Sequence, residues 1–155
     1  MDVYVETTVW SFAFADDAPD YRADTLRFFD RCRSGAIRPV ISAIVLQEIA
    51  RAHPERRKLL ENLIREIGPV LVPVSSRALA LAAAFVSTQP VPPSKPDDAR
   101  HVAVAFSEAI PLLVSWNFKH IANLRRADRF NAVAVIEGFS HTLRIASPAE
   151  VLYDP

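Results

Sequence analysis

The chain has 155 residues, of which half are hydrophobic and three are glycine, so one folded domain with a real core is expected and a disordered or fibrous chain is excluded. The 18 basic and 18 acidic residues cancel, which excludes a polycation that coats nucleic acid without selectivity. Cys32 is the lone cysteine, and no signal peptide or membrane-length apolar run is visible, so we expect a cytoplasmic protein with no membrane partner.

Strand-like and helical patterns alternate along the first half of the chain. Short runs rich in β-branched residues predict strands, and runs with helical spacing begin at serine, threonine or proline. The predicted order is strand 3–6, helical turn 7–14, helix 20–34, strand 37–41, helices 43–51 and 54–67, strand 70–74, and a helix that is capped at 75–76 and ends near 86.

The second half begins with a loop at 88–96 that holds four prolines and has no hydrophobic period. The alternation of strands and helices resumes beyond it, so we interpret the loop as a stiff connector within a single domain that spans 1–155. The remaining predictions are helix 97–109, strand 111–115, a short helix 117–124, strands 133–136 and 142–145, and a helix that starts at 147–150.

Strands that are apolar throughout and alternate with helices predict an α/β fold, with a mostly parallel central sheet covered on both faces. In such folds, ligands bind beyond the carboxyl ends of the strands. Glu6 and Asn117 both stand at such ends. Each also has a purely structural explanation, because a glutamate there can cap Thr7 and Thr8, and asparagine is an ordinary helix cap.

Three further acids lie on predicted helices. Glu48 stands on the edge of an apolar stripe, where an unpaired charge is costly, although a pair with Arg51 or another basic residue would explain it as well. Helical steps from Asp98 reach the apolar face, so Asp98 is expected to point toward the sheet. Asp97 lies on a mixed face, and we interpret it as the N-cap of its helix.

Hard oxygen ligands thus come from four separate elements: Glu6, Glu48, Asp98 and Asn117. Oxygen-only sites suit Mg²⁺ or Mn²⁺, and gathered carboxylates repel one another unless a cation lies between them. Such a metal activates water and neutralises a phosphate, as phosphodiester hydrolysis requires. The nearby histidines fit no zinc spacing, so we interpret His101 as a helix-face residue and His120 as a phosphate contact.

Four segments in this order carry a resemblance: VYVETTVW at 3–10, SAIVLQEI at 42–49, PDDARHVA at 96–103 and LVSWNF at 113–118. They resemble the PIN-domain family of metal-dependent ribonucleases, especially the VapC-like toxins of type II toxin–antitoxin modules. The resemblance covers nearly the whole chain. It implies a three-layer α/β/α sandwich, a homodimer, and inhibition by a cognate antitoxin protein that lies over the active groove.

The same resemblance implies a role for each site residue. Glu6 and Asp98 would be the principal ligands of Mg²⁺ or Mn²⁺. The catalytic set would be Glu6, Glu48, Asp98 and Asn117, with Thr8 and Asp97 in support. Two positions depart from the family pattern, because the first acid is usually aspartate and is here Glu6, and the fourth is often aspartate and is here the neutral Asn117. The departures predict weaker metal affinity.

A ribonuclease must also hold the phosphate backbone of its substrate. Basic residues close to the acids would attract RNA, namely Arg100, Lys119 and His120. A solvated helix face explains the later arginines at 125, 126 and 129 equally well.

Three functions follow from these residues. The leading one is a Mg²⁺- or Mn²⁺-dependent endoribonuclease that acts as the toxin of a toxin–antitoxin pair. The alternative is a degenerate PIN-like module that binds RNA or a protein, because Glu6 and Asn117 replace the usual aspartates. A phosphotransfer receiver ranks lower, because the strand at 70–74 runs into Ser75 and Ser76 where an aspartate would be needed.

Overall fold

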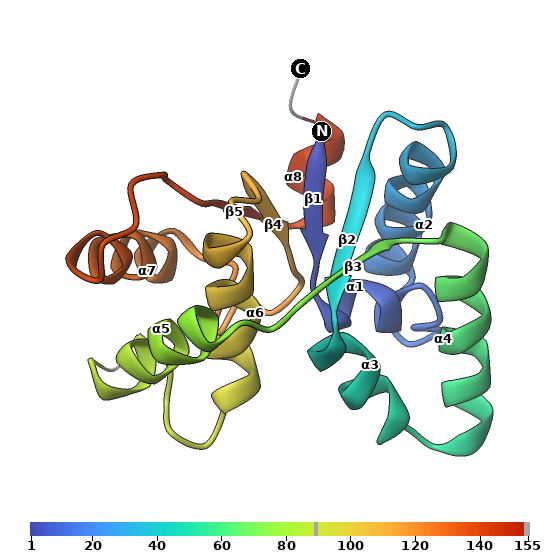
Figure 1. Cartoon of the computed structure of the whole chain (residues 1–155). Helices are drawn as coiled ribbons and strands as arrows, with labels where there is room; N and C mark the ends of the chain where they lie inside the picture. The colour runs from blue at the N-terminus through green and yellow to red at the C-terminus, as the bar shows by residue number, and fades with distance from the viewer. Residues whose placement is uncertain (89, 154–155) are drawn as a thin grey trace.

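The computed structural model describes residues 1–88 and 90–153, and five strands form one sheet at its centre (Figure 1). The strands are β1 (Asp2–Val5), β2 (Arg38–Ser42), β3 (Val70–Val72), β4 (Leu112–Val114) and β5 (Arg144–Ala146). They lie in the order β3-β2-β1-β4-β5, and every neighbouring pair is parallel. The first strand is therefore the middle of the sheet, with the later strands added on both sides.

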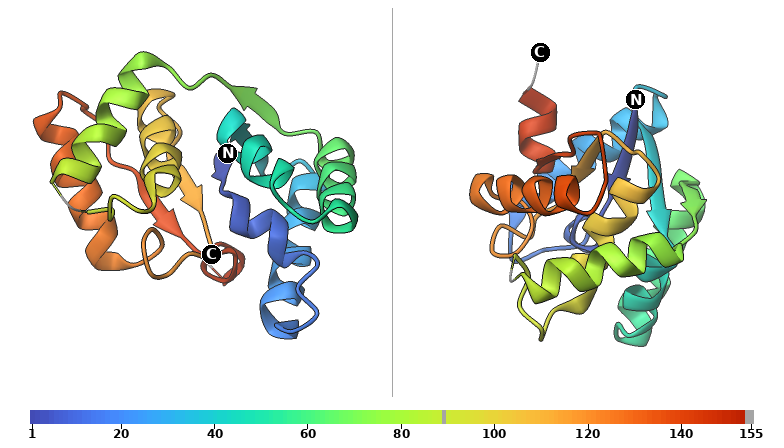
Figure 2. Two further views of the ribbon diagram at one scale, coloured as in Figure 1. Left: turned by 90° about the horizontal axis from the view of Figure 1, so that it is seen from below. Right: turned by 60° about the vertical axis from the view of Figure 1, so that its left-hand side comes forward.

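Helices cover both faces of this sheet. They are α1 (Thr7–Phe12), α2 (Pro19–Arg33), α3 (Ala43–Ala50), α4 (Pro54–Ile67), α5 (Ser76–Ser87), α6 (Pro96–Ser107), α7 (Leu124–Ile136) and α8 (Pro148–Tyr153). Helices α1 to α4 lie on one side and α5 to α7 on the other, and α8 packs against α2 (Figures 1 and 2). The predicted α/β class, with a parallel sheet between layers of helices, is confirmed.

Two predicted elements after β4 are wrong. The segment 117–123 forms turns instead of a short helix, with Leu124 already in α7, and 133–136 is the end of α7 instead of a strand. The β-branched residues Val133, Val135 and Ile136 favoured a strand. However, Phe130 and Ala134 are both buried, and their separation of one helical turn places them on the same face of α7. Burial of that face outweighs the local preference.

The boundaries around α6 also differ from the prediction. The helix begins at Pro96 with Lys95 at the N-cap position, so the interpretation of Asp97 as the N-cap is wrong. Proline fits the first helical position because its missing N–H would have no partner there. Of the predicted loop 88–96, Gln89 lies outside the described residues. Strand β5 covers Arg144–Ala146, so it lies slightly closer to the C-terminus than the predicted strand 142–145.

The register of the central strands positions the site. Val5 of β1 pairs with Val114 of β4, and the N–H of Glu6 donates to the carbonyl of Val114 at 3.1 Å. The side chains of Glu6 and Ser115 therefore emerge together at the carboxyl edge of the sheet. Helix α6 packs its apolar face into the core, and Val102 is fully buried there. That burial holds the first turn of α6, with Asp98, beside the same edge.

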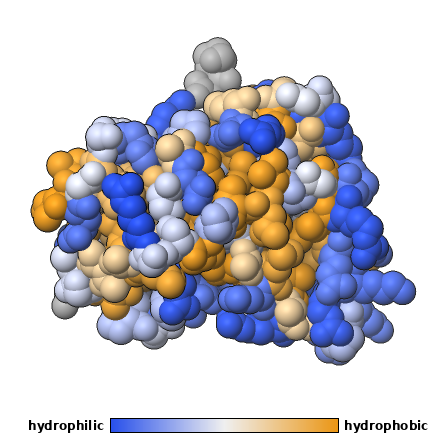
Figure 3. All heavy atoms as spheres, viewed as in Figure 1, coloured by the Kyte–Doolittle hydropathy of each residue, from blue (hydrophilic) through white to orange (hydrophobic). Residues whose placement is uncertain are grey.

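Apolar side chains also reach the surface along one edge of the sheet. Figure 3 shows a hydrophobic band over β3 and the chain that follows it. Strand β3 is an edge strand, and Leu71 at its middle is 58% exposed. None of the helices in the described ranges combines the length and apolar character that crossing a bilayer demands.

Candidate functional site

Glu6 stands at the junction of β1 and α1 and is almost fully buried. Its Oε2 accepts from the backbone N–H of Thr8 at 3.1 Å, and its Oε1 accepts from the Thr8 hydroxyl at 2.6 Å. The hydroxyl of Ser115 also donates to Oε1, at 2.5 Å. Glu6 therefore caps α1, which is the structural role that the sequence offered as the alternative. Three donors hold its carboxylate rigidly at the edge of the sheet.

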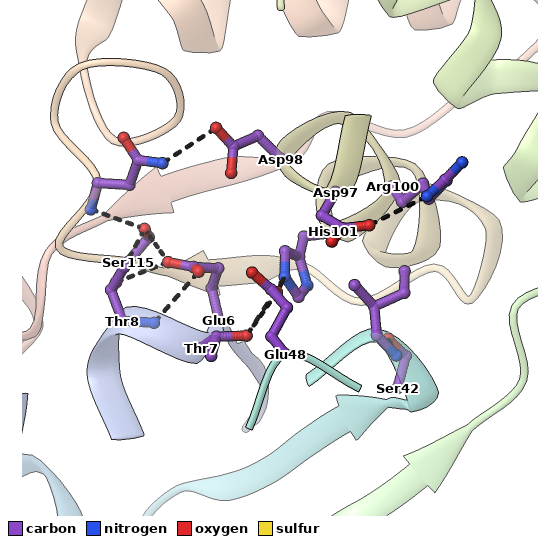
Figure 4. Close-up of polar contacts among 12 residues, drawn as sticks. Glu6, Thr7, Thr8, Ser42, Glu48, Asp97, Asp98, Arg100, His101 and Ser115 are labelled. Atoms are coloured by element: carbon purple, nitrogen blue, oxygen red, sulfur yellow. Dashed lines mark hydrogen bonds and ion pairs between the residues drawn. The ribbon is translucent and has the colours of Figure 1, made fainter. Parts of the chain in front are cut away.

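Glu48 reaches the same place from α3. Its Oε1 accepts from the hydroxyl of Thr7 at 2.8 Å and forms a very short hydrogen bond with Nε2 of His101 (Figure 4). The structural alternative of a basic partner for Glu48 is therefore met by His101 and not by Arg51, which pairs with Asp97 at 3.2 Å. Among the described residues, none donates a hydrogen bond to Oε2 of Glu48, so this oxygen is available to the site.

His101 is fully buried, and its interpretation as a helix-face residue is wrong. Nδ1 lies 2.7 Å from the hydroxyl of Tyr4, which in turn lies 2.8 Å from the hydroxyl of Ser42. Tyr4 and Ser42 are also fully buried. A chain of hydrogen bonds therefore runs from Ser42 through Tyr4 and His101 to Glu48, and it fixes the imidazole and, through it, the carboxylate.

The charge state of this chain follows from its surroundings. Burial alone lowers the pKa of His101, but the hydrogen bond with Glu48 and the nearby carboxylates raise it above its ordinary value. Burial also holds the pKa of Tyr4 far above its usual range, so that hydroxyl stays protonated. His101 has hydrogen-bond partners in both of its protonation states, since the hydroxyls of Tyr4 and Ser42 can each donate or accept.

Asp98 lies in the first turn of α6 and points into the site (Figure 4). Its Oδ2 accepts from Nδ2 of Asn117 at 3.2 Å. Burial and the charge of Glu6 raise the pKa of Asp98 to about 6, although the hydrogen bond from Asn117 lowers it. Ionisation of Asp98 among the other acids is therefore energetically costly, as expected of a carboxylate whose charge a bound cation would offset.

Asn117 uses its side-chain oxygen differently from the expectation that it ligates a cation. Oδ1 accepts from the backbone N–H of His120 at 3.0 Å and so closes a turn after β4. The amide nitrogen faces Asp98. In this geometry Asn117 orients Asp98, and its role as a ligand stays a prediction.

Asp97 is turned away from the acids. It accepts from Arg51 at 3.2 Å and from Arg100 at 3.0 Å. Arg100 is therefore engaged with Asp97 beside the site, and both arginines are partly exposed.

Positive charge gathers on the other side of Asp98. Lys119 is exposed, and His120 has a lowered pKa because of partial burial and the charges of Lys119, Arg126 and Lys95. Nδ1 of His120 is shielded from solvent and has no hydrogen-bond partner among the described residues. The predicted RNA contacts Lys119 and His120 thus belong to a basic cluster next to the turn that holds Asn117.

The donor atoms fit a divalent cation. One ligand atom from each of Glu6, Glu48 and His101 lies within 4.8 Å of the others. Asp98 lies outside this group of three, but it is near enough for the charges of Glu6 and Glu48 to raise its pKa. Among the described residues, only its Oδ2 accepts a hydrogen bond, and its Oδ1 accepts none. Carboxylate oxygens dominate the set, and oxygen donors suit Mg²⁺ or Mn²⁺.

Sequence reasoning placed the acids at one edge but missed their supports. His101 follows Asp98 by three positions, which places both on one helical face, and that spacing could have revealed it. Ser115 and Thr7 had no comparable signal, since a hydroxyl next to a strand end is commonplace. The hydrogen bonds that Ser115 and Thr7 donate to Glu6 and Glu48 decide which carboxylate oxygens remain free to bind a cation.

Comparisons with known proteins agree with the fold. No protein-family model and no curated protein matches the sequence. Among solved structures, a chain of VapBC2 from Rickettsia felis, bound to a DNA fragment from their promoter, is similar with a TM-score of 0.59. The identity is 14%, and the match covers 95% of this chain and 98% of that one. The likeness agrees, at the level of the fold alone, with the resemblance to VapC-like PIN domains.

Proposed function

We propose that this chain is a metal-dependent endoribonuclease and the toxin of a type II toxin–antitoxin pair. The observation that carries the proposal is the convergence of Glu6, Glu48 and His101 within 4.8 Å, with Asp98 near enough for the charges of Glu6 and Glu48 to oppose its ionisation. Carboxylates are placed at such cost where a cation offsets their repulsion. The structural similarity to a chain of VapBC2 supports the same class of protein.

The roles of the side chains follow from their contacts. Bound Mg²⁺ or Mn²⁺ would neutralise the phosphate and activate water for hydrolysis. Glu6, Asp98 and the open Oε2 of Glu48 would hold the cation. Asn117 orients Asp98, while Thr8 and Ser115 fix Glu6. These supports are fixed before substrate binds, which reduces the cost of ordering the site.

RNA is the proposed substrate. Lys119 and His120 lie just past Asn117, and a phosphate held by them would lie close to the acids. Arg100 would contribute from the other side if RNA displaces its bond to Asp97. Binding through such contacts is expected to weaken as salt rises.

A protein partner and a second copy of the chain complete the proposal. The similar structure is of VapBC2, so a cognate antitoxin is the proposed regulator. We also propose a homodimer and a cytoplasmic location.

The test is cleavage of single-stranded and structured RNA by the purified protein with Mn²⁺ and with EDTA. Asp98→Asn is expected to lower cleavage at least about a hundredfold, because it removes a ligand while keeping the shape of the side chain. Asp97→Asn is the matched control, and it should cleave within several-fold of the parent, since Asp97 faces Arg51 and Arg100. Undiminished cleavage by Asp98→Asn would contradict the assignment.

One observation favours the alternative, a degenerate module that binds RNA or a protein without cleaving. Three donors already occupy the oxygens of Glu6, so this carboxylate serves as a cap with or without metal. Titration with Mn²⁺ separates the two functions. Absence of binding at millimolar Mn²⁺, with the fold intact, would favour the binding module.

A further inference from the structure

The four residues that follow β4 alternate between two surroundings. Ser115 and Asn117 turn toward the acids, where they contact Glu6 and Asp98. Trp116 and Phe118 turn to an aromatic cluster instead. One short segment therefore joins the acidic site directly to a group of rings.

The cluster consists of Phe12, Tyr21, Trp116 and Phe118, which we call the aromatic platform. Tyr21 lies 4.6 Å from Trp116 and 6.3 Å from Phe118, measured between ring centroids. Phe12 lies 5.8 Å from Tyr21 and 6.0 Å from Trp116. Helices α1 and α2 and the turn after β4 thus contribute to one surface.

Trp116 is the fixed base of the platform. It is 6% exposed, its indole N–H donates to the hydroxyl of Thr25 at 2.8 Å, and its backbone N–H donates to the hydroxyl of Thr8 at 2.9 Å. Thr8 in turn donates to Glu6. The platform and the acidic site therefore share one rigid support.

Two rings of the platform face solvent. Tyr21 is 43% exposed and Phe118 is 44% exposed, although both already touch buried Trp116. Exposed rings on a rigid support, next to a charged site, present open faces to a planar ligand.

We infer that Tyr21 and Phe118 stack an unpaired base of single-stranded RNA and so position the neighbouring phosphate at the acidic site. The inference rests on the proposed nuclease function for the direction in which the RNA lies relative to the acidic site, although base stacking itself does not require cleavage. Base stacking on aromatic rings tolerates any sequence and needs a free base face, which a duplex does not offer.

The charges around the platform favour nucleic acid over an apolar protein segment. Lys119 follows Phe118 directly, and His120 lies in the basic cluster. Exposed Asp16, Asp17 and Asp20 precede Tyr21 in the chain and would repel phosphates. The RNA backbone is therefore expected to run along Lys119 and His120, with the base on the rings.

Binding is best measured without cleavage, in the full-length Asp98→Asn protein with EDTA. The probe is a short single-stranded RNA that contains 2-aminopurine, whose fluorescence falls when the base stacks. Adding Tyr21→Ala or Phe118→Ala is expected to weaken binding at least about fivefold and to abolish the quenching. Adding Tyr21→Phe should preserve both, because the ring remains. Leu124→Ala is the matched control, since Leu124 is 82% exposed outside the platform.

The outcomes separate this inference from the nuclease proposal. Platform-dependent binding by a protein whose parent never cleaves RNA would support the stacking surface and overturn the nuclease. Cleavage by the parent, with RNA binding and quenching unchanged in well-folded Tyr21→Ala and Phe118→Ala, would overturn the stacking surface alone. No binding of single strands, or equal binding of duplex RNA, would also overturn it. Thermal unfolding of each variant excludes loss of fold as the cause.

Discussion

Asp98 lies half-buried at the start of α6, and its pKa of about 6 reflects burial and the charge of Glu6. Its ordinary value is near 3.8, so the folded protein binds more protons than the unfolded chain between these values. The free energy of unfolding contributed by this group therefore falls as pH rises from about 4 to about 6. Above that range the cost of the ionised carboxylate is fully present, as long as no cation is bound.

Asp98→Asn is consequently expected to stabilise the metal-free protein while it removes cleavage. At pH 7 the gain in the free energy of unfolding should be about 1 kcal/mol, because a repelled charge is replaced by a neutral group that still bonds Asn117. Near pH 3 the gain should largely vanish, since Asp98 is then mostly neutral in both states. Urea denaturation of both proteins at the two pH values, in EDTA, measures the difference. A variant that is less stable at pH 7 would contradict the repulsion.

His101 is the residue whose contacts join the core to the site. His101→Ala leaves the hydroxyl of Tyr4 and the carboxylate of Glu48 without their buried partner. The expected loss in the free energy of unfolding is about 3 kcal/mol. Tyr4→Phe keeps the ring and removes the hydrogen bonds to His101 and Ser42, so its loss should be smaller, about 2 kcal/mol. Equal stability of His101→Ala and the parent in urea denaturation would show that the chain of hydrogen bonds contributes little.

For single residues, the positions of the charged side chains were easier to predict than the hydrogen-bond partners that hold them. Glu6 and Asp98 could be placed together because strand ends and helix starts meet at one edge of a parallel sheet. The partner of Glu48 could not, since local spacing offered Arg51, whereas the fold brings His101 from a helix far along the chain. The oxygen of Asn117 was expected to serve a cation, a metal-bound water or a cap; it accepts from the N–H of His120 after β4, and its role toward a cation stays a prediction.

At the scale of the element, helices with clear caps were predictable and the segment after β4 was not. Ser42 and Ser75 cap α3 and α5 as their positions in the sequence suggested. Within 117–123, Asn117 accepts from the N–H of His120 and Asn123 donates to the carbonyl of Phe118, and these bonds hold a turn whose sequence resembles a helix start. Long-range contacts of Trp116 and Asn117 settle its path, and no local pattern encodes these contacts.

Asn123 is expected to be the residue on which this turn and α7 both depend. Its side-chain oxygen accepts from the N–H of Arg126 at 2.8 Å, and its amide donates to the carbonyl of Phe118 at 2.6 Å. Asn123→Ala should lower the free energy of unfolding by about 1 kcal/mol or more, through loss of the cap. Leu124→Ala, at an exposed neighbouring position, should stay within about 0.5 kcal/mol of the parent. Chemical denaturation compares the two, and an equal loss in both would contradict the capping role.

At the scale of the whole molecule, the topology itself explains why the site forms where it does. Strand β1 lies between β2 and β4, and this order brings the segments that follow these three strands together in the middle of the sheet. The strand order could not be read from local patterns, yet a parallel sheet gathers the carboxyl ends of all its strands at one edge and so tolerates errors in the local assignments. That the site was foreseen while elements near it were misplaced follows from this tolerance.

The exposed edge of the sheet is where a second copy is expected to bind. Leu71 on β3 is 58% exposed, Leu46 on α3 is 40% exposed and Leu79 on α5 is 47% exposed. Figure 3 shows the apolar band over β3. An edge strand with apolar side chains favours association, and a charge placed on it opposes association.

Leu71→Glu should therefore convert the proposed homodimer to monomer, with at least a tenfold rise in the dissociation constant, since an unpaired carboxylate would be buried at the contact. Ile136→Glu is the matched control, because Ile136 is 81% exposed at the end of α7, on the other side of the sheet. Analytical ultracentrifugation over a range of concentrations measures both. If Ile136→Glu dissociates the dimer and Leu71→Glu does not, the two copies meet through α7 and the edge at β3 remains free for another partner.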